Sequence, residues 1–236
     1  RATAGPAYPP DEADLRDVRV AGLDLPGRAT VALFATTALV LLDYTGAWRP
    51  LAGLLPQVGA YDVPGTPVAV ERFVLYGVVP VLIVALGFRD RLARYGLRLG
   101  DWRWGAGLLL AGLAIMTPII LGLSRLPSFA GYYGARGGPF VDVLAGNALE
   151  LFPAEFLLRG FLLFALLRRM GPLALVVVQI PFVFAHVGKP DLELWSTFIG
   201  GSIFAWLDWR TGSILWSALG HLYVLTLMLV AVGAAT

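Results

Sequence analysis

The sequence predicts an all-α membrane protein, a polytopic bundle of about seven transmembrane helices. Of its 236 residues, 58% are hydrophobic and only 14% are charged, and the mean hydropathy is +0.74. Soluble domains carry closer to about 25% charged residues. Long apolar runs also recur along the whole chain. Such a chain cannot bury its apolar surface in one soluble core, so the lipid bilayer is an expected partner.

Seven apolar runs approach or exceed the length that crosses a bilayer, which is about 20 helical residues. They are expected at residues 30–44, 68–88, 105–124, 141–170, 172–187, 192–208 and 213–234. Pro181 interrupts the short fifth run. Residues 1–28 are polar, lack an apolar signal region and are expected to form a mobile cytoplasmic tail. Residues 29–236 are expected to form a single transmembrane domain.

Arginine in the loops sets the expected orientation, because cytoplasmic loops are rich in positive charge. Five arginines stand between residues 89 and 103, Arg168 and Arg169 end the fourth run, and Arg210 ends the sixth. Alternating seven spans places all three groups on one side. We therefore expect an integral protein of a prokaryotic plasma membrane, with its N-terminus in the cytoplasm and its C-terminus outside.

Several function classes conflict with the sequence. The chain has no cysteine, which excludes disulfides and thiolate chemistry. Its net charge is only +2 and no basic tract is present, so nucleic acid is not an expected partner. No GxSxG run marks a serine nucleophile, and no HExxH run marks a zinc protease.

A carboxylate and a guanidinium interrupt the apolar stretch FPAEFLLRGFLLF at residues 152–164. A charged side chain deep in a bilayer costs about 2.5–3.5 kcal/mol on insertion scales. Glu155 and Arg159 are spaced i, i+4 with the carboxylate nearer the helix N-terminus, which is the better orientation for an ion pair. The pair either pins one helix to its neighbour or belongs to a functional site.

The two histidines of the chain favour a site. His186 ends the fifth run and His221 lies inside the seventh. One histidine in an apolar helix is usually a hydrogen-bonded core residue, but here both accompany a buried Glu–Arg pair. Three helices are therefore expected to converge in the bundle core.

Three chemistries suit one glutamate and two histidines. They are His–His–Glu zinc ligation with an open water position, metal-free hydrolysis by activated water, and a proton relay in a transporter. Zinc is disfavoured because no two of the ligands share a helical face at i, i+4. A transporter is disfavoured because inverted halves with broken helices are not evident.

Three short motifs follow in order through the C-terminal half. The first reads Ala154-Glu155-Phe-Leu-Leu-Arg159-Gly160, the second is the FxxxH run Phe182–His186, and in the third a Thr-Gly-Ser turn precedes His221. Together with LRLGDWRWG before the third run, they resemble the CPBP family of intramembrane glutamic endopeptidases. That family is named for CAAX processing and bacteriocin processing and is also called Abi. The resemblance covers residues 97–230.

The resemblance implies a helix bundle around an intramembrane cavity, without a cofactor or metal. It implies that Glu155 and His186 activate water for peptide hydrolysis, that Arg159 orients Glu155, and that His221 donates to the oxyanion. A membrane-anchored peptide or protein is the implied substrate.

Two positions depart from the family pattern. Ala154 stands where the first glutamate of EExxxR is usual, and Leu225 stands where Asn or Asp follows the last histidine. Either this is a single-glutamate variant, or it is a catalytically degenerate scaffold or binding protein. The run from His186 to Glu193 is similar to an H-x-x-K-P-x-x-E run of single-glutamate members. Glu193 would then be a supporting carboxylate, or it simply pairs with Lys189 and the helix dipole.

Overall fold

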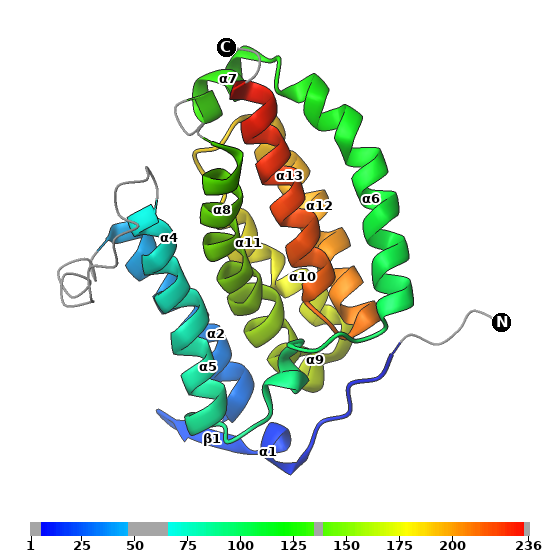
Figure 1. Cartoon of the computed structure of the whole chain (residues 1–236). Coiled ribbons are helices and arrows are strands. Elements are labelled where there is room, and N and C mark those ends of the chain that lie inside the picture. Colours follow the sequence, from blue (N-terminus) through cyan, green and yellow to red (C-terminus); the bar gives the residue numbers. More distant parts are fainter. Residues whose placement is uncertain (1–5, 47–65, 135–138, 234–236) are drawn as a thin grey trace.

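The computed structural model describes residues 6–46, 66–134 and 139–233 as a helical bundle with one short hairpin (Figure 1). The predicted all-α membrane bundle is confirmed. Most of the connection after the first predicted span lies outside the described residues, as does part of the Gly-rich loop before residue 139. The elements, in chain order, are α1 (Glu12–Leu15), β1 (Asp17–Val20), β2 (Leu23–Pro26), α2 (Gly27–Thr45), α4 (Thr66–Arg72), η1 (Phe73–Val78), α5 (Val79–Leu82), η2 (Ile83–Gly87), η3 (Leu92–Tyr95), α6 (Trp102–Leu123), α7 (Pro127–Tyr133), α8 (Phe140–Glu155), η5 (Phe156–Leu162), α9 (Leu163–Met170), η6 (Gly171–Leu173), α10 (Ala174–Val177), α11 (Gln179–Phe184), α12 (Asp191–Thr211) and α13 (Leu215–Gly233).

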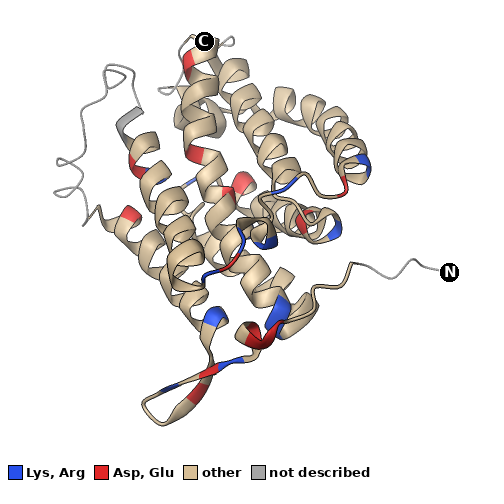
Figure 2. Cartoon of the chain, turned by 60° about the horizontal axis from the view of Figure 1, so that its bottom comes forward, with Lys and Arg blue, Asp and Glu red and all other residues tan. Residues whose placement is uncertain are grey.

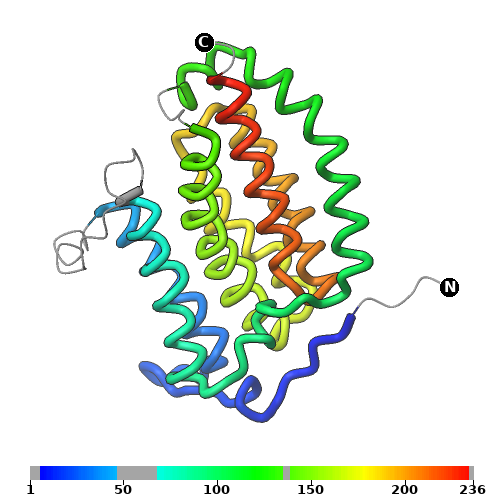
Figure 3. Tube along the Cα trace, viewed as in Figure 1, coloured from blue at the N-terminus to red at the C-terminus, as the bar shows by residue number. Residues whose placement is uncertain are grey.

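The predicted count of seven spans is not confirmed. Among the described residues, five helical stretches are long and apolar enough to cross a membrane: Gly27–Thr45, Val68–Gly87, Trp102–Leu123, Phe140–Phe184 and Leu215–Gly233. The fourth of these contains both the fourth and the fifth predicted spans. The chain reverses within it at Gly171, whose φ is +60°, as the tube in Figure 3 shows. α12 has 21 residues, but its charged, glycine and serine residues lower its hydropathy.

One continuous helical rod occupies the centre of the bundle. It comprises α8, the π-helical segment η5, and α9 (Figure 1). Every residue from 155 to 168 is buried, including Leu157, Phe161 and Leu162 at 0% exposure. A helix that is apolar on all sides must be covered on all sides, and α2, η1, η3 and α10 supply much of that cover. Glu155 and Arg159 therefore lie in the middle of the protein and not on its lipid-facing surface.

The three arginine groups meet at the end of the bundle that carries α1, opposite the C-terminal end of α13 (Figure 1). Arg168 donates to the backbone oxygen of Arg94, Arg98 donates to the backbone oxygen of Gly212 at 2.8 Å, and Arg210 pairs with Asp101 at 3.4 Å. Figure 2 brings this end forward, with blue segments on its loops and helix ends. The clusters thus share one side, as the sequence predicts; which side faces the cytoplasm stays a prediction.

The segment predicted as a mobile tail contains secondary structure from residue 12 onward. Strands β1 and β2 pair antiparallel, with Val18 opposite Leu25. Asp14, 4% exposed, receives hydrogen bonds from Arg28 at 2.9 Å and from Arg94 at 2.7 Å. These contacts fasten α1 under the bundle; the mobility of the segment stays a prediction.

Tyr8 inserts its ring beside Phe164, with the ring centroids 5.3 Å apart. Burial raises the pKa of Tyr8 to about 12 against the opposing charge of Arg98. Its hydroxyl therefore stays protonated and donates to the backbone oxygen of Trp209 at 2.6 Å. The N-terminal segment thus covers α9 and the C-terminal end of α12.

Anchoring of α1 is expected to be lost in acid. Burial alone would raise the pKa of Asp11, but the Asp14 backbone N–H, Arg94 and Arg28 outweigh it and hold that pKa well below its usual range. A lowered folded-state pKa gives stability that is present above about pH 4, the ordinary carboxyl value, and lost as the pH falls through the lowered value. The melting temperature in detergent is therefore expected to hold down to about pH 4 and to fall below it.

The Arg94→Gln variant tests this contribution, because it removes the pairs of Arg94 with Asp11, Asp14 and Asp90. We expect its acid-dependent fall in melting temperature to be smaller than that of the wild type. An identical fall in both proteins would show that other carboxyl groups cause the acid sensitivity.

Candidate active site

Glu155 and Arg159 form the ion pair that their spacing predicts. Arg159 Nη1 donates to Glu155 Oε2, and both side chains are 1% exposed. Glu155 ends α8, and Arg159 lies in the π-helical segment η5, a backbone irregularity that is frequent at functional sites. Gly160 is required there, because a Cβ would meet the backbone oxygen of Tyr95 at 2.8 Å.

His221 of α13 contacts the same carboxylate. Its Nδ1 lies 2.6 Å from Glu155 Oε1. An ionised carboxylate only accepts hydrogen bonds, so this contact places a proton on Nδ1. The other nitrogen, Nε2, is then an acceptor in the neutral ring and a donor in the imidazolium. The His221 side chain is 15% exposed, so it is the more open member of the pair.

His186 completes the cluster from the turn after α11. Its ring centroid lies 6.2 Å from that of His221, and the two rings are nearly parallel. Nδ1 of His186 lies 2.8 Å from the backbone oxygen of Phe182, which can only accept. Nε2 of the neutral ring therefore presents a lone pair. The expected convergence of three helices is present, because the short η6–α11 return brings His186 to the depth of His221.

Phe182 lies between the charged and the imidazole groups. Its ring centroid is 3.9 Å from the guanidinium carbon of Arg159, 4.6 Å from the His186 ring and 6.1 Å from the His221 ring. A cation over an aromatic face is attracted by the ring quadrupole, most strongly where water is excluded. Phe182 thus fixes Arg159 and His186 in one arrangement.

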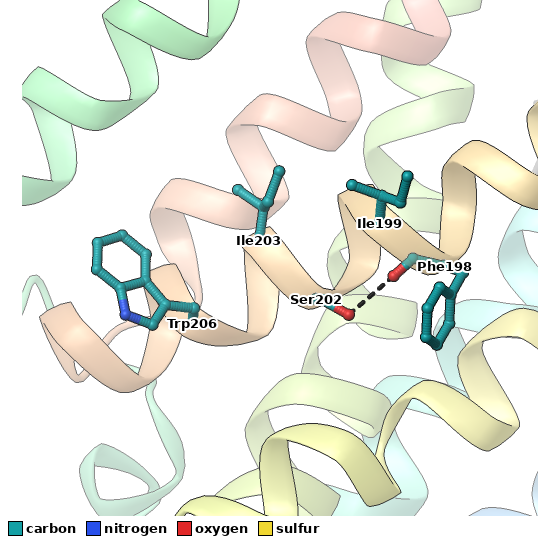
Figure 4. A pocket seen from close by; sticks show the side chains of 5 residues that line it. All are labelled: Phe198, Ile199, Ser202, Ile203 and Trp206. Atoms are coloured by element: carbon teal, nitrogen blue, oxygen red, sulfur yellow. Dashed lines mark hydrogen bonds between the residues drawn. The ribbon is translucent and has the colours of Figure 1, made fainter.

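A shallow groove of about 400 Å³ lies elsewhere, on an apolar face of α12 (Figure 4). It is lined by Phe198, Ile199, Ser202, Ile203 and Trp206. No member of the Glu155 cluster lines it, and its lining offers little besides apolar side chains. The candidate site is therefore the buried cluster and not this groove.

Residues 136–227 match a family model described as type II CAAX prenyl endopeptidase Rce1-like. The C-terminal half carries a CPBP-like domain. No curated protein and no solved structure matches the chain. At the level of the family, the match supports a membrane endopeptidase of the CAAX-protease type. The matched residues include all three motifs, whereas the LRLGDWRWG linker lies before them.

Among the described residues of the CPBP-like domain, no hydrogen bond or ion pair joins Glu193 to Glu155. Glu193 pairs with Lys189 at 2.8 Å and accepts a hydrogen bond from the Tyr133 hydroxyl at 2.7 Å. These contacts join the start of α12 to α7. They fit the interpretation that Glu193 simply pairs with Lys189. A supporting catalytic role of Glu193 stays a prediction.

Ala154 and Leu225, the two departures of this CPBP-like domain from the family pattern, both pack against apolar clusters. Ala154 packs against the large apolar cluster that contains Leu75 and Tyr76. Leu225 packs against the second cluster, near Phe129. Thr226, one residue further, receives a hydrogen bond from the Asn147 amide at 3.0 Å. Despite these departures, Glu155 contacts Arg159 and His221, and the His186 ring lies beside that of His221.

Zinc binding by the cluster stays an open alternative. Among the described residues, the group of His, Asp or Glu ligand atoms found within 4.8 Å of one another is Asp11, Asp14 and Asp90, not Glu155 with the two histidines. The three acids at the N-terminal segment are already paired with Arg28 and Arg94.

Two buried residues were given no role in the sequence-based expectations. Phe182 stands there only as the first residue of the FxxxH motif. Asp208, fully buried near the end of α12, lies at the boundary of a predicted span and carried no signal of its own.

Replacing Gly201 with alanine is expected to displace Phe182. A Cβ at Gly201 would lie 2.6 Å from the Phe182 ring and 2.5 Å from Gln179 Oε1. Overpacking of this kind costs about 1–3 kcal/mol, and it moves the ring that holds His186 and Arg159. We expect a lower melting temperature together with a lower cleavage rate.

Gly200→Ala is the matched control, because a Cβ at the neighbouring position meets nothing within 4 Å. Its melting temperature and cleavage rate are expected to equal those of the wild type. Equal behaviour of the two alanine variants would contradict the tight α11–α12 contact.

Proposed function

We propose that this protein is an intramembrane endopeptidase that hydrolyses a peptide bond of a membrane-anchored peptide or protein. The observation that carries the proposal is the buried Glu155 carboxylate, held by Arg159 and hydrogen-bonded to His221, with the His186 ring beside it. Water activation needs a base within hydrogen-bond reach of the attacking water. A buried carboxylate with two nearby imidazoles meets this requirement.

The hydrogen bonds suggest a separate catalytic role for each side chain of the cluster. Each carboxylate oxygen accepts more than one hydrogen bond, so Glu155 retains capacity for a water proton beside its two partners. Nε2 of His186 accepts from the same water and helps to orient it. A His221 ring that carries both protons donates through its Nε2–H to the tetrahedral oxyanion, while its Nδ1–H stays on Glu155. Arg159 holds Glu155 in the required rotamer.

A catalytically degenerate scaffold is the second candidate. It is favoured by Ala154, which removes the usual first glutamate of the motif, and by Leu225, which removes a polar partner after His221. Both positions are filled by apolar packing, which suits a stable protein whether or not it is a catalyst.

Cleavage of a peptide library fused to a membrane anchor separates the two candidates. One arm of the library carries a C-terminal prenyl group, because the description of the matched family names a prenyl endopeptidase. The other arm carries a transmembrane helix. Cleavage of either arm by the folded protein supports the peptidase. A folded protein that cleaves no member of the library would favour the scaffold. A parallel arm with a chelator tests zinc, since loss of activity there would revive the His–His–Glu metal site.

A further inference from the structure

Asp208 is a buried carboxylate that the proposed mechanism leaves unexplained. It is 0% exposed, in the last turn of α12. Its Oδ2 accepts a hydrogen bond from the Ser217 hydroxyl at 2.9 Å, while its Oδ1 has no hydrogen-bond partner among the described residues. Burying a carboxylate with an unpaired oxygen is costly, and such groups in folded proteins call for an explanation.

Arg159 has the complementary deficit. Its Nη1 donates to Glu155, but its Nη2 is buried and has no hydrogen-bond partner in the part of the chain that the structure describes. The rings of Phe182 and Phe204 lie 3.9 and 5.4 Å from its guanidinium carbon and cover it. Arg159 and Glu155 are also the charged residues whose fields act on Asp208. Among the described residues, Nη2 of Arg159 is thus a buried donor that needs an acceptor, and Oδ1 of Asp208 is a buried acceptor that needs a donor. The charges of the two side chains act on each other.

The helix geometry places these two atoms on the same side of the cluster. α8 with η5 and α13 run antiparallel and pack against each other (Figure 1). Glu155 and His221 meet across them. Arg159 lies one turn after Glu155, and Ser217 lies one turn before His221, so both lie one turn nearer the end that carries α1. Ser217 in turn holds Asp208.

We propose that Asp208 is the second acidic residue of this site, a positioning residue that acts on Glu155 through Arg159. The proposal rests on the proposed function. Nη2 of Arg159 reaches Oδ1 of Asp208 directly after a small side-chain rotation, or across one water molecule. One guanidinium then serves two carboxylates, and Asp208 fixes the rotamer from which Nη1 holds Glu155.

The kinetic test uses Asp208→Asn on a membrane-anchored, internally quenched peptide. We expect kcat to fall about tenfold, as for coupled residues of one network, while KM is unchanged because Asp208 does not touch the substrate. The control is Asp43→Asn, which removes a carboxylate bound to Arg72 and Tyr76 outside the site and should leave both constants unchanged. In an Arg159→Lys background, Asp208→Asn should have little further effect on kcat, because the second guanidinium arm is already absent.

The outcomes separate this proposal from the proposed function. Wild-type kcat in Asp208→Asn, or equal losses with and without Arg159→Lys, would overturn the role of Asp208 while leaving the peptidase standing. If the wild type cleaves nothing, the interaction between Arg159 and Asp208 is tested by melting temperatures. The four proteins compared are the wild type, Asp208→Asn, Arg159→Lys and the double variant. A double variant that loses less than the sum of the single losses supports it, and additive losses overturn it.

Discussion

Glu155→Gln is expected to lower the cleavage rate about a thousandfold, in the range that positioned acid–base groups contribute. Glutamine keeps the shape of the side chain but cannot take a proton from water. It also weakens the hydrogen bond that orients His221, because an amide oxygen is a weaker acceptor than a carboxylate, so both water activation and oxyanion stabilisation weaken. The measurement is single-turnover cleavage of a membrane-anchored peptide. Because the change is nearly isosteric, the variant is expected to fold.

Glu150→Gln is the matched control for this experiment. Glu150 lies on the same helix, but its partner is Arg72, away from both histidines. Its loss should leave the cleavage rate unchanged. A Glu155→Gln protein that cleaves at the wild-type rate would remove Glu155 from the mechanism. Equal losses in both variants would point to damage of α8 in general and not to chemistry at residue 155.

The central pair is the part of the site that local sequence pattern predicts best. The i, i+4 spacing of Glu155 and Arg159 is a property of one helix, and an apolar setting forces the two charges together. The meeting with His186 and His221 was expected only because few other polar residues are present in the spans. The structure places the four side chains together. Their roles in catalysis stay predictions.

The contacts of Asp208 and of the N-terminal acids with distant segments could not be predicted from the sequence. Asp208 gains its significance from Ser217 and Arg159, which lie on two other helices, and no periodicity marks it. The N-terminal acids behave in the same way. Asp14 reads as part of a polar tail, yet its partner Arg94 is 80 residues away. Polar composition describes what a segment can bury unaided, and it does not show which charges the fold brings to it.

The break predicted between residues 170 and 172 coincides with a chain reversal in the structure, whereas the count of seven spans is not confirmed. By length and composition alone, residues 140–184 form one apolar stretch. Gly171 produces that reversal through a positive φ that glycine adopts without strain. The short return after it is what brings His186 inward. The reversal that divides this apolar stretch is therefore the same one that brings His186 to the cluster.

Arg159→Met is expected to destabilise the protein by about 3–5 kcal/mol, the usual cost of removing one partner from a buried ion pair. Methionine fills much of the space beneath Phe182, so the loss comes chiefly from leaving Glu155 as an uncompensated charge, with Asp208 nearby. The measurement is reversible unfolding in detergent micelles. Arg169→Met removes a pair with Asp17 at the protein surface and is expected to cost at most about 1 kcal/mol.

The double variant Glu155→Gln/Arg159→Met sharpens the interpretation. With the Glu155 charge removed as well, the penalty of Arg159→Met should shrink, because no unpaired charge remains at residue 155. That recovery would mean that the pair is retained for function and orientation more than for net stability, since a buried ion pair and an apolar replacement are often close in free energy. Additive losses would contradict this account and would assign the stabilisation to the packing of Arg159 between Phe182 and Phe204.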